Sequence, residues 1–234
     1  MKKYIGTKQV EAELMNMGKA YEKGLLQAGR VPSKTEQDKP GYHVKYMDGY
    51  GSWSPAKPFE EAYKLADTAL DRMLIEGEDL TVKLEKLLSF TTTLAFDMLD
   101  TATKAMLMAQ AGVMQDYRNV LNQRYTKMES SNGSLSNLSF SVAISLLKNG
   151  FAIRRTGWNG KGLFVVKQIP AHIESETIQK MQSLPQAAKD RIMETKGFID
   201  YTSQCLIYNE NTGRADSWVP SISDVFAEDW EIVN

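Results

Sequence analysis

The sequence predicts an α+β fold in three parts: a small antiparallel-sheet unit at 1–58, a long helical hairpin at 59–128 and a small α+β domain at 138–234. Short aromatic and β-branched runs bounded by turn residues occur near both ends of the chain, as in strands. Between them, apolar residues recur in alternating steps of three and four, which is typical of a helix with one apolar face. A small, polar run at 129–137 predicts a linker before the last part.

The N-terminal part is predicted to contain a β-hairpin. Residues 42–46 are aromatic and β-branched, and Asp48-Gly49 offers a turn into a second strand at 50–53. A further short strand is expected at 8–13. Residues 29–40 are polar and include two prolines, which predicts a loop.

The middle part is predicted to be two helices joined by a turn at the three threonines 91–93. Pro58, a residue typical of a first helical turn, precedes the first helix, and the second helix has its apolar seam between 107 and 128. The seam of the first helix consists of Phe59, Tyr63, Ala66, Leu70, Met73, Gly77, Leu80, Leu84 and Leu87. Because a two-helix hairpin buries little apolar area alone, we expect it to pack on copies of itself; packing on the flanking domains is the alternative.

The C-terminal domain alternates short helices and strands. Ser139 or Ser141 is expected to cap a helix that ends at Asn149-Gly150, followed by strands at 151–155 and 163–169 around a glycine-rich turn. Residues 172–196 are polar and helix-like, broken at Pro185, and are predicted to be an insertion. A hairpin at 204–219, a short helix at 221–229 and a last segment at 230–233 complete the domain.

Composition excludes several classes of protein. The chain has 234 residues, of which 42% are hydrophobic, and its 28 basic and 29 acidic residues give a net charge of −1. Such a chain lacks the field of a general DNA or RNA binder or of a membrane-surface protein. The single cysteine, Cys205, and two histidines argue against disulfide, zinc and His-based catalytic sites. We expect a cytoplasmic protein with no cofactor, metal or catalytic residue.

The densest candidate for ligand binding is the run 154–162. It combines three cations with Trp158, Asn159 and three glycines, parts that suit an anionic ligand carrying a base or a ribose. The alternative is a tight turn with Trp158 in the core. A second candidate is 216–224, where Ser221 caps a helix whose N–H groups are suited to an anion; ordinary capping beside a core Trp218 is the alternative.

Two similar short segments, an internal echo in the sequence, occur near the two ends of the chain. Ser52-Trp53-Ser54-Pro55 and Ser217-Trp218-Val219-Pro220 both follow a predicted hairpin strand and lead into an acidic, aromatic segment. Either a diverged duplication or a common way of leaving a strand for a helix explains the echo.

Residues 137–234 resemble the phage family of Thoeris anti-defence protein two. The resemblance rests on Leu147-Lys148-Asn149-Gly150, on the run from Arg155 to Gly162, and on Trp218-Val219-Pro220-Ser221 with Ala227-Glu228-Asp229-Trp230. It implies a non-enzymatic sponge: small α+β subunits that assemble, typically as tetramers, with ligand pockets between subunits. The ligands implied are glycocyclic ADP-ribose or cyclic dinucleotides, captured without cleavage in the host cytoplasm. The long 172–196 segment departs from the family, and the N-terminal part resembles phage segments of unassigned role.

Eight residues are predicted to bind the ligand. Trp158 and Trp218 would stack or form walls, Arg155 and Lys161 would meet phosphates, and Asn159, Ser221 and Asp224 would bond ribose or base, beside Pro220. The alternative function is an oligomeric interaction protein that blocks a host defence protein directly. A nucleotide-degrading enzyme is a third reading, which the two histidines in weak contexts disfavour.

Overall fold

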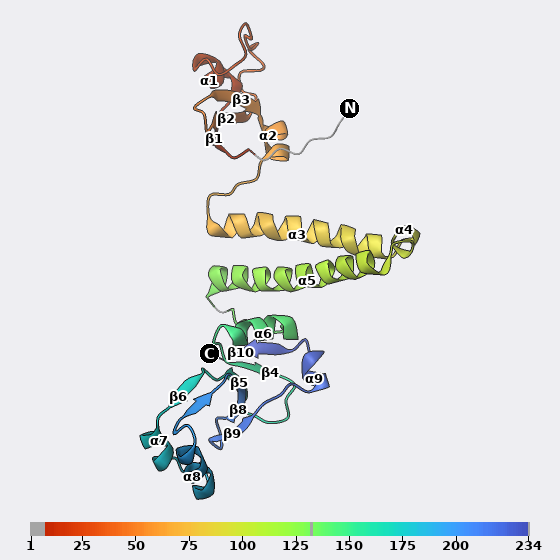
Figure 1. Ribbon diagram of the computed structural model, residues 1–234. Helices are drawn as coiled ribbons and strands as arrows, with labels where there is room; N and C mark the ends of the chain where they lie inside the picture. The colour runs from red at the N-terminus through yellow and green to blue at the C-terminus, as the bar shows by residue number, and fades with distance from the viewer. Residues whose placement is uncertain (1–7, 132, 234) are drawn as a thin grey trace. The chain divides into compact units, whose positions relative to one another are not determined.

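The protein is described by a computed structural model that covers residues 8–131 and 133–233. The chain forms two compact units, Met1–Ile75 and Glu76–Asn234. Helices and antiparallel sheets occur in both units, which confirms the α+β class (Figure 1). Within the described ranges, no helix is long and apolar enough to cross a membrane.

The first unit contains a three-stranded antiparallel sheet. Its order is β1 (Val10–Leu14), β2 (Gly41–Tyr46) and β3 (Gly51–Pro55), with helices α1 (Met17–Glu22) and α2 (Ala56–Ala62). The predicted turn between β2 and β3 is confirmed: Gly49 has a φ of 84°, and Asp48 accepts a hydrogen bond from the N–H of Tyr50 at 3.0 Å. Helix α1 was not predicted; Asn16 caps it by accepting from the N–H of Lys19.

The predicted single helix from Phe59 onward is wrong, because the chain breaks between α2 and α3 (Ala69–Thr91). Tyr63 is extended, with φ −129° and ψ 142°. The ring of Phe59 stacks on Tyr63 at 4.9 Å and on a tyrosine of β2, so these aromatics belong to the sheet unit and not to the helical seam. Asp71 and Thr68 exchange hydrogen bonds at 2.8 and 3.1 Å, which starts a new helix.

The turn of the hairpin lies where the threonines predict it. The hydroxyls of residues 91–93 each donate to the carbonyl three residues earlier, and Thr93 then caps α4 (Leu94–Asp97). Helix α5 (Thr101–Ser130) follows, capped by Asp100. Along the hairpin, Leu84 of α3 and Leu121 of α5 are almost fully buried, in agreement with the predicted seam.

The C-terminal end of α5 is tied to the segment that follows it. The side-chain amide of Gln123 donates to the carbonyl of Ser136 at 2.7 Å and accepts from its N–H at 2.7 Å. Asn119 donates to the carbonyl of Asn137 at 2.9 Å. The end of the predicted linker is therefore held against the helix.

The C-terminal domain is a five-stranded antiparallel sheet covered by α6 (Phe140–Lys148), which Ser139 caps (Figure 1). The strand order is β10 (Trp230–Ile232), β4 (Ile153–Arg155), β5 (Leu163–Lys167), β8 (Cys205–Asn209) and β9 (Arg214–Ser217). Helix α9 (Ile222–Val225) connects β9 to β10. The core between α6 and the sheet consists of Leu138, Ala143, Leu147, Ile153, Val165, Ala227 and Trp230.

The predicted insertion folds as its own small element. Two helices, α7 (Ser175–Lys180) and α8 (Gln186–Glu194), flank Pro185, as the sequence predicts. Two short strands that were not predicted, β6 (Ala171–Ile173) and β7 (Ile199–Tyr201), pair at its base. The insertion therefore leaves and re-enters the domain between β5 and β8 without interrupting their pairing.

Candidate ligand-binding site

Asp224 lies at the centre of a polar network at the start of α9. Its side chain is 9% exposed. One carboxylate oxygen accepts from the N–H and the hydroxyl of Ser221, at 2.9 and 2.8 Å, and Ser221 in turn caps α9. The other oxygen accepts from the indole N–H of Trp158 and from Arg155, both at 2.9 Å. One carboxylate thus joins the glycine-rich turn after β4 to the start of α9.

Arg155 is held between two carboxylates. Its Nε donates to Asp229 at 2.7 Å, and its Nη1 donates to Asp224 and to the carbonyl of Ser223. The second oxygen of Asp229 accepts from the N–H of Gly157 at 2.7 Å. Because β10 pairs with β4, Trp230 lies directly opposite Arg155 and brings Asp229 to it. The guanidinium is therefore neutralised within the domain.

The charges in this network are stabilised at neutral pH. Burial alone would raise the pKa of Asp224, but hydrogen bonds from Trp158, Arg155 and Ser221 outweigh it and lower the pKa to about 2. The pKa of Asp229 is also lowered, since the hydrogen bonds from Arg155 and Gly157 outweigh burial. The hydrogen bond to Asp229 is the main cause that raises the pKa of Arg155.

Three tryptophans meet beneath this network. Trp230 is fully buried, and the rings of Trp158 and Trp218 contact it edge to face at centroid distances of 5.5 and 6.1 Å. Phe140 of α6 packs on it at 5.6 Å. Trp158 and Trp218 are themselves half-buried, so each combines a contact to the core with an exposed part.

The structure does not join all eight predicted residues. Arg155, Trp158, Ser221 and Asp224 form one network, and Trp218 reaches it through Trp230. The side chains of Asn159 and Lys161 are exposed in the turn between β4 and β5, and Pro220 is half-buried before α9.

Sequence reasoning missed the role of Asp229 and the central position of Trp230. Arg155 and Asp229 are 74 positions apart in the sequence, and this separation hides the pairing of β10 with β4. The signal in the sequence is the pair Asp229-Trp230 at the start of the last strand. Asp229 is engaged in the network described above through both of its carboxylate oxygens.

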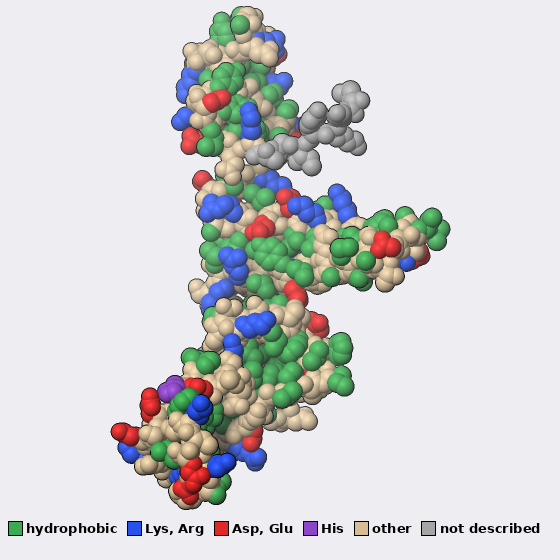
Figure 2. Space-filling view, in the orientation of Figure 1, with side chains coloured by type: hydrophobic (Ala, Val, Ile, Leu, Met, Phe, Trp, Pro, Cys, Tyr) green, Lys and Arg blue, Asp and Glu red, His purple; other side chains and the backbone are tan. Residues whose placement is uncertain are grey.

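An exposed apolar surface lies beside the network. Val219, Ile222 and Phe226 are each at least 80% exposed. Figure 2 shows hydrophobic side chains gathered over this part of the C-terminal domain. Exposed apolar patches of this kind are a common feature of binding surfaces.

The site offers binding groups of a simple kind. Parts of two indole rings, the exposed amide of Asn159 and the exposed ammonium of Lys161 are available to a ligand with bases, riboses and phosphates. Among the described residues, no group of three or more His, Cys, Asp or Glu side chains is arranged to hold a metal ion.

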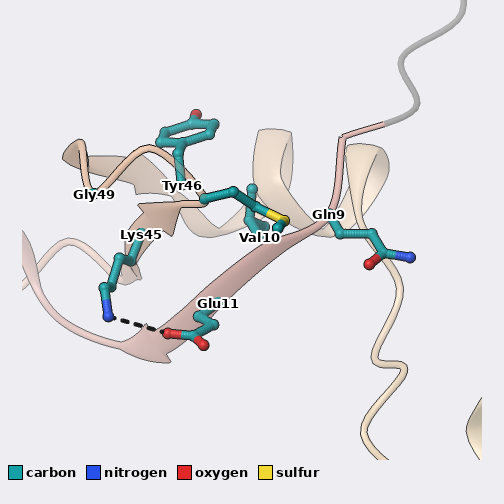
Figure 3. Close-up of a pocket in the computed structure, with 7 residues that line it drawn as sticks. Gln9, Val10, Glu11, Lys45, Tyr46 and Gly49 are labelled. Carbon is teal, nitrogen blue, oxygen red and sulfur yellow. Dashed lines mark hydrogen bonds and ion pairs between the residues drawn. The ribbon is translucent and has the colours of Figure 1, made fainter.

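A separate depression of about 390 Å³ lies in the first unit (Figure 3). It was not predicted from the sequence. The start of β1 and the end of β2 form this depression. Lys45 and Glu11 form an ion pair at its rim, with 3.4 Å between Nζ and the carboxylate oxygen. Its lining consists of Gln9, Val10, Glu11, Lys45, Tyr46, Met47 and Gly49.

Comparisons with known proteins match two parts of the chain. The family model for the Thoeris anti-defense 2-like domain matches residues 138–233, and the model for Sequestin matches residues 67–127. Among curated proteins, Thoeris anti-defense 2 of Bacillus phage SP01 is 31% identical over 102 residues. That alignment covers 42% of this chain and 96% of the phage protein.

Proposed function

The chain belongs to the Thoeris anti-defense 2 family, and from this premise we propose that its C-terminal domain binds a cyclic nucleotide signal and sequesters it without cleavage. The observation that carries the proposal is the coincidence of the family match at 138–233 with the Trp158–Asp224 network. The proposed ligands are glycocyclic ADP-ribose or a cyclic dinucleotide. The Sequestin match at 67–127 agrees with sequestration. The proposed place of action is the cytoplasm of a bacterial host.

The eight predicted residues have two tasks in this proposal. Asp224, Ser221 and Arg155 are positioning residues, because their polar atoms are engaged with one another. Arg155 uses its Nε and Nη1 in the hydrogen bonds to the two carboxylates, which holds the guanidinium in place. The groups assigned to the ligand are the exposed parts of the remaining five: Trp158, Asn159, Lys161, Trp218 and Pro220.

The strength of binding is within reach of such groups. A dissociation constant of about 10 nM corresponds to roughly 11 kcal/mol. Stacking on an aromatic ring contributes about 1–3 kcal/mol per base, and a hydrogen bond to a charged group about 1.5–3 kcal/mol. Two indoles and a few polar contacts on a prearranged site can supply most of that total. A network fixed before binding also lowers the entropy cost.

A second copy of the chain is the proposed cover for the apolar surface beside the site. Val219, Ile222 and Phe226 extend from the half-buried Trp218 and Pro220 along α9. Packing this surface against another copy would place the exposed parts of the site at the edge of an interface. The ligand would then lie between subunits, excluded from water on both sides.

The test is calorimetric titration of the full chain with a panel of cyclic nucleotides. The double variant Asn159→Ala with Lys161→Ala removes two exposed side chains and is expected to weaken binding at least tenfold without changing the melting temperature. Lys148→Ala, an exposed lysine at the end of α6, is the matched control and should bind normally. Trp158→Ala with Trp218→Ala is less informative, because both rings also pack on Trp230.

Wild-type affinity in the double variant would contradict the site assignment. Failure of the wild-type chain to bind any member of the panel would contradict the function. The direct blocking of a host protein would then be the better account.

A further inference from the structure

The glycine-rich turn between β4 and β5 carries two of the polar groups that the proposed function assigns to the ligand. Asn159 and Lys161 lie in this turn, and both side chains are exposed. An exposed side chain binds a ligand best when its backbone is fixed beforehand, because ordering a residue on binding costs conformational entropy. The contacts that fix the backbone of this turn therefore contribute to affinity.

The first half of the turn is anchored to the network at the start of α9. The N–H of Gly157 donates to Asp229 at 2.7 Å, and the indole N–H of Trp158 donates to Asp224 at 2.9 Å. These two hydrogen bonds hold the chain up to the residue before Asn159. The second half of the turn, residues 159–162, needs an anchor of its own.

The turn between β8 and β9 supplies that second anchor. The side-chain amide of Asn211 donates to the carbonyl of Lys161 at 2.8 Å, and the N–H of Glu210 donates to the carbonyl of Gly162 at 2.9 Å. Gly162 has a φ of 75°, and a Cβ at this position would lie 2.5 Å from the amide nitrogen of Asn211. The two turns are therefore in direct contact.

The turn between β8 and β9 is fixed by its own hydrogen bonds. The side-chain oxygen of Asn209 accepts from the N–H of Asn211 at 2.9 Å, and its carbonyl accepts from the N–H of Gly213 at 2.8 Å. Strand β8 pairs with β5 on one side and with β9 on the other. Asn211 thus holds the glycine-rich turn from a position that the sheet has already set.

We propose that Asn211 is a positioning residue for the nucleotide ligand, acting through the backbone of Lys161. This inference rests on the proposed function, because that function makes Asn159 and Lys161 contacts to the ligand. The two residues lie between two anchors, Trp158 on one side and Asn211 on the other. Without the amide of Asn211, the exposed half of the turn moves freely, and the ligand has to order it on binding.

The experiment is calorimetric titration of the full chain, with glycocyclic ADP-ribose and cyclic di-AMP as the probes. Asn211→Ala is expected to weaken binding about threefold to tenfold, the range that one hydrogen bond accounts for. Asn211→Leu keeps a similar size without a donor or a charge, and should weaken binding equally. Thr212→Ala is the matched control in the same turn. Its hydroxyl accepts from the N–H of Arg214 at 3.4 Å, and this variant should bind as the wild type does.

A double-mutant cycle distinguishes positioning from a direct contact or a general loss of stability. Asn159→Ala with Lys161→Ala removes the side chains that Asn211 positions. In that background, the further change Asn211→Ala should alter the affinity less than about twofold, because the effects of coupled residues do not add. An undiminished effect of Asn211→Ala in that background would overturn the inference.

Backbone NMR relaxation of the chain without ligand gives an independent measurement. The order parameters of residues 159–162 should be lower in Asn211→Ala than in the wild type, and those of α6 should be unchanged. Equal order parameters in the turn would overturn the inference. Wild-type affinity in Asn211→Ala would overturn the inference alone, whereas a wild-type chain that binds neither probe would contradict the proposed function as well.

Discussion

Replacing Asp224 with asparagine tests the network at its centre. The substitution keeps the size of the side chain but removes the charge that meets Arg155, and its amide nitrogen cannot accept from Ser221. The lowering of the pKa of Asp224 from 3.8 to about 2 corresponds to about 2 kcal/mol, at 1.36 kcal/mol per pH unit. We expect Asp224→Asn to lower the free energy of unfolding by about that amount at pH 7.

The pH dependence follows from the direction of that shift. A carboxyl whose pKa is lowered by folding contributes stability that is fully present above its unfolded pKa of 3.8 and lost as the pH falls through about 2. The difference between wild type and Asp224→Asn should therefore fall to about half its neutral value near pH 3. Urea denaturation followed by tryptophan fluorescence, at pH 7 and pH 3, measures both values.

Asp216→Asn is the matched control for this prediction. Asp216 pairs with Arg214 at the surface of β9, and we expect its loss to cost less than about 0.5 kcal/mol. Equal effects of the two substitutions, or a difference for Asp224→Asn that does not change with pH, would refute the reasoning.

Three further predictions concern packing, backbone and protonation. Trp230→Ala should destabilise the C-terminal domain by about 3–5 kcal/mol in a thermal melt, because it removes the ring on which Trp158 and Trp218 pack. Gly157→Ala should cost about 1–3 kcal/mol in urea denaturation, since its Cβ would lie 2.5 Å from a carboxylate oxygen of Asp229. The pKa of His172 should exceed 6.5 in an NMR titration, because Asp200 accepts a hydrogen bond from its ring at 2.6 Å. Asp200→Asn should lower that pKa. The stability that this pair contributes is present below pH 6.5 and is lost as the pH rises through the raised pKa.

Local signals account for the parts of the fold that the sequence predicts. The Asp48-Gly49 turn, the cap at Ser139 and the break at Pro185 are each set by the backbone preferences of one or two residues. Helix α1 and the break after α2 were not predicted, because contacts to residues distant in the sequence determine both of them. In the second case, stacking of Phe59 on the sheet unit overrode the regular apolar spacing.

The candidate site was predicted in composition but not in arrangement. The residue types at 155–161 and 218–224 point to one region, and the structure brings Arg155, Trp158 and Asp224 together. The spacing in the sequence does not reveal that the carboxylates neutralise Arg155, because antiparallel pairing of β4 with the last strand creates that contact. Long-range pairing of this kind depends on the whole sheet, and no local pattern encodes it.

Native mass spectrometry of the full chain, mixed with a panel of cyclic nucleotides and then heated to release what is bound, tests the central claim most directly. We predict that one class of cyclic nucleotide binds to an assembly of the chain, at a fixed number of molecules per copy. Heating should release that ligand with its original mass. A released product of lower mass would contradict sequestration without cleavage, and an intact assembly that binds no cyclic nucleotide would contradict the proposed ligand class.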